Sequence, residues 1–348
     1  MRNAPVAGWQ GSTAPRARGV SPVHAKRGDR QRDAPARQSP DHDQARALRQ
    51  SCRAELLPAR PGRATAARDR RHRMARSGRD GLMSVPEIVH AGALLGTYIV
   101  ERARDLAASG VRAVEVGLPL DEAQGLTPME RAGRVHRALK GAGIAVRVVH
   151  AEFGGAADLS VADVDARRGA IERHKLALAT CAVLNSRLLV IHAGHHYTEG
   201  DADRAVDRAA DSISQLLDHA ADCGVTLAVE NLPPGHVLDS PQAVREFVEG
   251  INSPKLRACY DSGHANVTGD AAEAVDAMAP VLASLHLHDN DGTADQHRML
   301  GEGTIDWRAV GDRVRAASFE GPALLELRLP DGHTAASMRS RALDLLGY

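Results

Sequence analysis

The stretch VLASLHLHDNDGTADQHRMLGEGTIDW, residues 281–307, combines a buried strand pattern with candidate metal ligands. Its apolar run carries His286 and His288 at alternate positions, so both side chains lie on one face of a predicted strand. An acidic loop with two more ligand-type residues, Asp295 and His297, follows the strand, and a helix pattern begins at the end of the stretch. The stretch therefore predicts a strand–loop–helix unit that carries half of a metal site.

Strand and helix patterns alternate on both sides of this unit. The predicted strands are Glu87–Ala91, Ala113–Gly117, Ala145–Ala151, Arg187–His192, Val225–Glu230, Leu256–Asp261, Leu282–His288 and Ala323–Leu327. The predicted helices are Tyr98–Ser109, Pro128–Ala142, Asp163–Leu184, Asp203–Cys223, Pro241–Gly250, Ala271–Ala279, Trp307–Ala317 and Thr334–Leu346. Eight such units predict an α/β protein with a closed (β/α)₈ TIM barrel. A doubly wound open sheet is the alternative, but no GxGxxG motif follows the first predicted strand.

The first part of the chain differs in composition from the rest. Residues 1–82 hold 19 Lys or Arg against 7 Asp or Glu, whereas residues 83–348 hold 25 against 37. The first segment is rich in Arg, Ala and Pro and has no sustained apolar period, so it could not bury enough surface to offset the entropy of ordering. We expect a disordered extension over residues 1–82, followed by a TIM-barrel catalytic domain over residues 83–348.

The origin of this extension has three interpretations. Met83 stands directly before the first strand pattern, so we favour a mis-assigned start over a genuine extension. An Arg-rich targeting segment and a basic nucleic-acid-binding arm are the alternatives, although the seven acidic residues argue against targeting.

The apolar runs and the cysteines bear on localisation. No apolar run reaches the length of about 18 residues that spans a bilayer, so we expect no membrane span. The four cysteines are far apart and form no CxxC pair; they are Cys52, Cys181, Cys223 and Cys259. We expect reduced thiols and a cytoplasmic protein.

Six consecutive predicted strands end in a His, Asp or Glu side chain. These residues are His150, His192, Glu230, Asp261, His286 and Glu326. In a barrel the carboxyl ends of the strands meet at one mouth, where the active sites of this fold lie. Apolar residues precede each of them, and a buried carboxylate needs a partner. We therefore expect a metal site at the mouth.

A central set of three carboxylates and one imidazole carries this expectation: Glu230, Asp261, His286 and Glu326. Such a set suits Mn²⁺, Zn²⁺, Co²⁺ or Mg²⁺, and the alternative is that each carboxylate caps a helix or pairs with an Arg. A second set could bind further metal ions or orient a substrate, or could consist of ordinary surface residues; it comprises His150, His192, His264, Asp295 and His297. We do not count His288 as a ligand, and we expect His195 and His196 to be exposed in a loop.

Four motifs carry a resemblance to a known family: AVEN at 228–231, YDSGH at 260–264, HLHDNDG at 286–292, and DQH with LGEGTIDW at 295–307. They resemble the xylose-isomerase-like TIM-barrel superfamily, which includes sugar isomerases, sugar epimerases and endonuclease IV. The resemblance covers residues 87–345. It implies that the central set holds one divalent ion, that Glu230 and Glu326 exchange protons with substrate carbon, and that His264 contacts the substrate.

The resemblance extends to two branches of the superfamily. The ligand pattern of endonuclease IV, with its three-zinc cluster, maps onto both sets of residues named above. The acidic excess of residues 83–348 and the scarcity of aromatic residues, with three Phe, four Tyr and two Trp, argue against a nucleic-acid partner. The DNDG and GEGTIDW motifs resemble the group named sugar phosphate isomerase/epimerase.

We therefore expect a divalent-metal-dependent sugar or sugar-phosphate isomerase or epimerase that transfers protons through an ene-diolate. An endonuclease IV-like multi-zinc phosphodiesterase acting on abasic DNA is the alternative, and a non-catalytic binding barrel is the third interpretation. The best-known ketose 3-epimerases carry a substrate-binding Glu and an Arg where this chain has His236 and Gly292. We therefore do not assign the substrate of those enzymes to this chain. The expected partner is a small sugar or polyol, and the sequence leaves a homo-oligomer open.

Overall fold

The computed structural model describes residues 85–91, 99–117, 120, 125–198, 200–327 and 332–348. The strands are β1 Glu87–Ala91, β2 Ala113–Gly117, β3 Ala145–His150, β4 Leu188–Ile191, β5 Thr226–Glu230, β6 Leu256–Asp261, β7 Leu282–Leu287 and β8 Pro322–Leu325. The helices are α2 Ile99–Ala108, α3 Pro128–Gly141, α4 Val164–Leu184, α5 Ala202–Asp222, α6 Pro241–Ile251, α7 Ser262–Thr268, α8 Ala271–Met278, α9 Trp307–Ala316 and α10 Ala335–Leu346. Short 3₁₀ turns lie at η2 Gly155–Ala157 and η3 Ala279–Val281.

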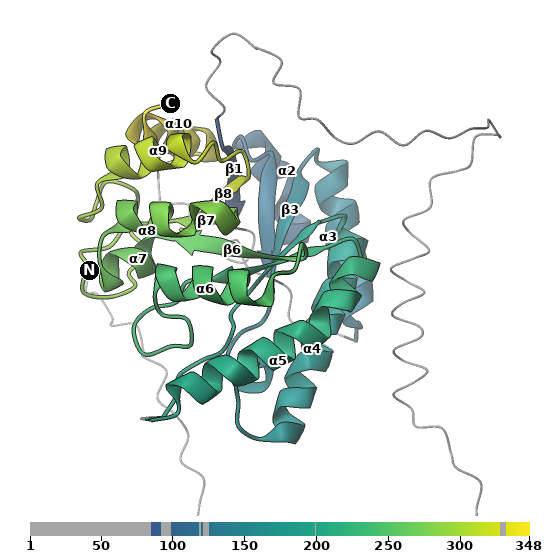
Figure 1. Ribbon diagram of the computed structural model, residues 1–348. Coiled ribbons are helices and arrows are strands. Elements are labelled where there is room, and N and C mark those ends of the chain that lie inside the picture. The colour runs from purple at the N-terminus through teal and green to yellow at the C-terminus, as the bar shows by residue number, and fades with distance from the viewer. Residues whose placement is uncertain (1–84, 92–98, 118–119, 121–124, 199, 328–331) are drawn as a thin grey trace, which may run out of the picture. The chain divides into compact units, whose positions relative to one another are not determined.

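The eight strands are parallel and close into a barrel in chain order. β1 pairs with both β2 and β8, which completes the closure. Helices lie outside the strands, as α4, α5 and α6 do in Figure 1. The predicted (β/α)₈ TIM barrel is confirmed, whereas the extension predicted over residues 1–82 lies outside the described residues.

Local sequence signals set the ends of several helices. Thr127 and Glu130 form a capping box at the start of α3, and Pro128 occupies its first position, where no hydrogen-bonded N–H is needed. Asn185 and Asn252 end α4 and α6 in the left-handed conformation. These caps fix the residue at which α3 begins and the residues at which α4 and α6 end.

Alternate residues of the strands pack on opposite sides of the barrel wall. Val149, Leu189 and Val229 belong to the large buried cluster that the strands share with the helices. A separate small cluster contains their chain neighbours Val148, Leu188, Val190 and Ala228, together with Cys259. Since a parallel sheet in this fold is covered on both faces, the strands are apolar throughout, and polar groups appear at their ends.

One helix was not expected from the sequence. Helix α7 was not predicted; it begins directly after β6, where the Asp261 side chain accepts a hydrogen bond from the His264 N–H at 2.7 Å. Cys181 and Cys259 are free and buried. None of the helices among the described residues is long and apolar enough to cross a membrane.

Candidate metal centre at the barrel mouth

The six predicted strand-end residues lie together at the carboxyl end of the barrel. Seven of the predicted site residues line a cavity of about 200 Å³, namely His150, His192, Glu230, His264, Asp295, His297 and Glu326. The other two, Asp261 and His286, are fully buried and contact residues of the lining. A larger hollow of about 710 Å³ lies near the opposite ends of β3 and β4, away from this cluster.

Glu230, at the end of β5, is surrounded by four imidazoles. Its Oε2 lies 3.3 Å from His150 Nε2 and 3.4 Å from His192 Nε2. Its Oε1 lies 3.5 Å from Nδ1 of both His264 and His286. Burial opposes ionisation, but the charge of His286 and the hydrogen bonds of His150 and His192 hold the pKa of Glu230 well below its usual range. Glu230 is therefore an ionised carboxylate inside the protein.

His286, on β7, lies between three carboxylates. Its Nδ1 is 3.1 Å from Glu326 Oε2 and 3.5 Å from Glu230 Oε1, and its Nε2 is 3.2 Å from Glu115 Oε2. The Nδ1 atom is buried but makes no hydrogen bond with any described residue. A buried nitrogen without a hydrogen bond, facing two carboxylates, is a donor set that fits a divalent cation.

Asp261, at the end of β6, already has protein partners. His288 Nε2 lies 3.1 Å and 3.0 Å from its two oxygens, and the His264 backbone N–H donates to Oδ1. The His264 ring donates from Nδ1 to the Asn231 carbonyl at 2.9 Å, which turns Nε2 toward Asp295 Oδ2 at 3.4 Å. Asp261 is thus held in place by His288 and by helix α7, next to the Glu230 cluster.

The loop after β7 closes one side of the cavity. His297 Nε2 lies 3.1 Å from Asp295 Oδ2, and His297 Nδ1 donates to the Glu326 carbonyl at 2.8 Å. The His297 ring also stacks on His288, with ring centroids 4.0 Å apart. These contacts bring both predicted loop residues of the second set to the site.

Carboxylates raise the pKa of two histidines at the cavity, whereas burial lowers the pKa of His192. Burial would lower the pKa of His150, but the Glu230 hydrogen bond and the Glu115 charge raise it to about 9. Burial likewise opposes the charge of His264, yet Asp261 and Asp295 raise its pKa to about 10. Positive charge is therefore favoured at the site, and a bound divalent ion would replace these protons.

The structure tests the alternative partners of the carboxylates. Asp261 does cap a helix, as that alternative expected, in addition to its histidine contacts. Among the described residues, neither Glu230, Asp261 nor Glu326 forms an ion pair with Lys or Arg. Their ion-pair partners are histidines, and such a set of carboxylates and imidazoles could hold a metal ion.

Two residues at the site were missed or undervalued from the sequence. Glu115, in the strand AVEVG, contacts His286 although it was not among the candidates. Its only signal is one acidic residue inside an apolar strand. His288 was not counted as a ligand, and it contacts Asp261. Phe153 lines the cavity and stacks on His192, with centroids 4.4 Å apart.

Comparisons with known proteins agree with the family resemblance of the sequence motifs. The family model described as "Xylose isomerase-like TIM barrel" matches residues 103–343. An uncharacterized protein of Methanocaldococcus jannaschii is 29% identical over 188 residues, which are 51% of this chain and 63% of that protein. D-psicose 3-epimerase of Agrobacterium fabrum is 26% identical over 162 residues, 44% of this chain and 54% of that enzyme. These matches cover less than two thirds of either relative.

A solved structure, named a D-tagatose 3-epimerase-like protein, has the same fold. It superposes with a TM-score of 0.65 at 22% identity and covers 75% of this chain and 98% of its own. At this identity the likeness supports the fold and leaves the activity to be argued from the site.

Proposed function

Because the chain belongs to the xylose isomerase-like TIM-barrel family, we propose that it is a divalent-metal-dependent isomerase or epimerase of a small sugar or polyol. The observation that carries this proposal is the placement of Glu230 and Glu326 within 3.5 Å of His286 Nδ1, which lacks a hydrogen bond, at the barrel mouth. The relative named D-psicose 3-epimerase supports a sugar as the class of substrate.

Glu230, Asp261, His286 and Glu326 are the residues that would hold the ion. When bound, a divalent ion supplies a Lewis acid that polarises a carbonyl and stabilises negative charge on an ene-diolate. His288 orients the Asp261 carboxylate through its Nε2, and Glu115 orients the His286 ring from the opposite side. The protein thereby fixes the ligands before any substrate enters.

Glu230 and Glu326 are the proposed acid and base. Both line the cavity, and both approach His286 from different strands, so a sugar between them would meet a carboxylate on each face. One carboxylate removes a proton from carbon and the other returns a proton. Return to the opposite face of the same carbon gives epimerisation, and return to the neighbouring carbon gives isomerisation. The Nε2 side of His264 would orient a substrate hydroxyl.

The cavity lining favours an uncharged substrate within this class. The described residues that line it include three carboxylates and six histidines but neither Lys nor Arg. A phosphate group is usually bound by Arg, Lys or backbone N–H groups. We therefore favour a neutral ketose or polyol over a sugar phosphate.

The test is to follow hydrogen exchange in a panel of ketoses with the variants Glu230→Gln and Glu326→Gln. Solvent deuterium should enter a substrate carbon with the natural chain, and each variant should lower that rate by about 10² to 10⁴. Glu172→Gln, on the exposed face of α4, is the matched control and should exchange normally. Exchange at the natural rate in both variants would show that the roles are wrong.

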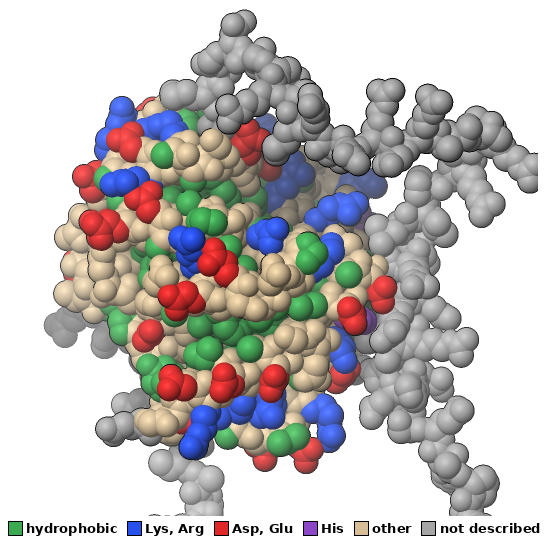
Figure 2. Space-filling view, in the orientation of Figure 1, with side chains coloured by type: hydrophobic (Ala, Val, Ile, Leu, Met, Phe, Trp, Pro, Cys, Tyr) green, Lys and Arg blue, Asp and Glu red, His purple; other side chains and the backbone are tan. Residues whose placement is uncertain are grey.

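One observation supports a second candidate, the multi-zinc phosphodiesterase. All nine residues of its ligand pattern lie at this one mouth, including the His264–Asp295–His297 group. Figure 2 shows acidic and basic side chains interspersed on the helical side of the barrel, and the described residues that line the mouth include neither Lys nor Arg to bind DNA phosphates. We expect no nicking of abasic duplex DNA; nicking that Glu230→Gln abolishes would replace the isomerase proposal.

A further inference from the structure

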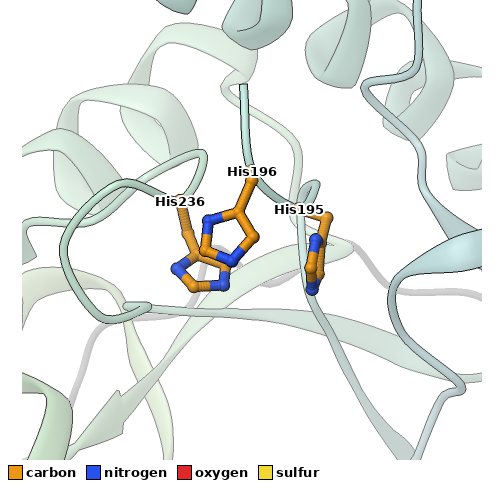
Figure 3. Close-up of side chains that lie close together, drawn as sticks. All are labelled: His195, His196 and His236. Atoms are coloured by element: carbon orange, nitrogen blue, oxygen red, sulfur yellow. The ribbon is translucent and has the colours of Figure 1, made fainter. Parts of the chain in front are cut away.

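Three histidines form a cluster next to the candidate centre but outside its ligand set. His195 and His196 come from the loop after β4, and His236 comes from the loop after β5 (Figure 3). We propose that these three residues, the rim histidines, form a separate site for one borderline divalent cation such as Zn²⁺, Cu²⁺ or Ni²⁺. The proposal concerns binding and does not depend on the isomerase activity.

The spacing of the rim histidines suits a shared ion. Each offers one ring nitrogen, and these atoms all lie within 4.8 Å of one another. The ring centroids are 3.8 Å apart for His196 and His236, 4.5 Å for His195 and His196, and 5.0 Å for His195 and His236. A tetrahedral Zn²⁺ with Zn–N bonds of about 2.1 Å separates its ligands by about 3.4 Å, so a movement of about 1 Å completes the site.

In two of the rim histidines, the second ring nitrogen is fixed in a way that is common in metal-binding histidines. His196 donates from Nδ1 to the Gly235 carbonyl at 3.2 Å, and His236 donates from Nδ1 to the Pro233 carbonyl at 3.0 Å. Because a carbonyl only accepts, the proton of each neutral ring is on Nδ1 and the lone pair is on Nε2. Metal-ligating histidines are commonly fixed in this way by a backbone carbonyl.

Backbone contacts hold the two loops together at this cluster. His196 and His236 face each other in an antiparallel β-bridge, and the Val237 N–H donates to the His195 carbonyl at 3.2 Å. A side chain at Gly154 would lie 3.0 Å from the His195 ring, so the glycine leaves room for that ring to lie where it does. The three imidazoles are therefore positioned before an ion arrives.

The surroundings distinguish this cluster from the histidines of the candidate centre. His150, His264 and His286 each lie within ion-pair distance of a carboxylate. Among the described residues no carboxylate forms such a pair with a rim histidine, so protonated rings at these distances would repel one another without compensation. A shared cation held by neutral imidazoles removes this conflict.

The site would lie at the entrance of the substrate cavity. His195 and His236 line the same cavity as Glu230 and Glu326, but the rim histidines contribute none of the central ligands. Three imidazoles leave a tetrahedral ion with one open position. An ion there would add a positive charge to a lining that has neither Lys nor Arg among its described residues.

The test uses the full-length chain without an affinity tag, freed of metal and titrated with Zn²⁺ against a chromophoric chelator. We expect His196→Ala and His236→Ala each to lose one equivalent per chain, or to bind it at least about tenfold more weakly. His136→Ala, on α3 and away from the mouth, is the control and should bind as the natural chain does. Glu230→Gln, in the candidate centre, should keep the rim equivalent.

A second measurement identifies the ligands directly. Cu²⁺ bound at the rim should show nitrogen hyperfine structure in electron paramagnetic resonance. This structure should weaken in His196→Ala. In His196→Cys binding should return in part, with a spectrum changed by the sulfur ligand. Circular dichroism confirms that each variant is folded, and His196 is exposed enough for its removal to be tolerated. Equal Zn²⁺ stoichiometry and affinity in the natural chain and in both folded alanine variants would overturn the proposal.

Discussion

Glu115 and His286 approach each other from opposite sides of the barrel, with Glu115 Oε2 3.2 Å from His286 Nε2. Both side chains are buried, and they come from β2 and β7. The carboxylate accepts a hydrogen bond from Nε2, so Nδ1, the nitrogen that faces Glu230 and Glu326, is the proposed ligand atom.

Glu115→Gln should therefore weaken metal binding without removing a ligand. The amide can still accept a hydrogen bond, but it no longer carries the negative charge that increases the basicity of the His286 ring. We expect a loss of about 10- to 100-fold in Mn²⁺ or Zn²⁺ affinity, measured by calorimetry on the metal-free chain. Glu172→Gln should leave the affinity unchanged; unchanged affinity in Glu115→Gln as well would remove Glu115 from the site.

Asp289 should be a major source of stability for the loop after β7. It is fully buried and accepts hydrogen bonds from the Gly301 N–H at 2.8 Å, the Asn290 N–H at 2.9 Å and the Trp307 indole N–H at 2.8 Å. Asp289→Asn should lower the free energy of unfolding by about 3 kcal/mol, because several buried donors lose a charged acceptor. Trp307→Phe removes only one of those donors and should cost less. Urea denaturation of both variants gives the comparison, and equal stability of Asp289→Asn and the natural chain would contradict it.

Gly263 should be intolerant of any side chain. A Cβ atom at this position would overlap the His288 ring, which must then leave Asp261. We expect Gly263→Ala to lower both the melting temperature and the metal affinity, the latter by at least about tenfold. Gly169→Ala is the matched control, since nothing lies near a Cβ there and α4 should gain up to about 1 kcal/mol. Similar behaviour of the two variants would show that the Asp261–His288 contact is dispensable.

His174 should make the protein sensitive to mild acid. Its ring is buried in α4, and burial lowers its pKa to about 4, whereas the unfolded chain protonates near about 6.5. Between these values the unfolded chain binds the proton and the folded chain does not, so stability falls as the pH falls from about 6.5 toward 4. We expect the free energy of unfolding, measured by urea denaturation, to be lower at pH 4.5 than at pH 7. This decrease should be about 2 to 3 kcal/mol smaller in His174→Leu than in the natural chain. An identical pH effect in both would assign the acid sensitivity to other groups.

The sequence predicted the barrel because its strands are short apolar runs separated by helix patterns with clear caps. It also predicted which residues meet at the mouth, since topology alone brings the ends of successive strands together. The structure places Glu230, Asp261, His286 and Glu326 there, and their catalytic and metal-binding roles stay predictions.

Features that depend on register and on loop contacts were not readable from the sequence. Glu115 lies at a register shift between β2 and β3, and such a shift decides which way a side chain points. Asp261 was interpreted as either a ligand or a helix cap, but the same carboxylate begins α7 and also binds His288, a partner that the sequence did not indicate. His196 is exposed as expected, but its pairing with His236 depends on two loops that meet only in the folded chain.

The four proposed ligands lie on β5, β6 and β7 and directly after β8, which are consecutive strands on one side of the barrel. Pairing between neighbouring strands needs only local chain closure, whereas β1 meets β8 by joining residues far apart in the sequence. During folding, the complete central set can therefore assemble before the barrel closes, and Glu115 of β2 joins afterwards. We expect a metal ion to bind the second half of the chain early in folding. Metal should therefore raise the folding rate as well as lower the unfolding rate.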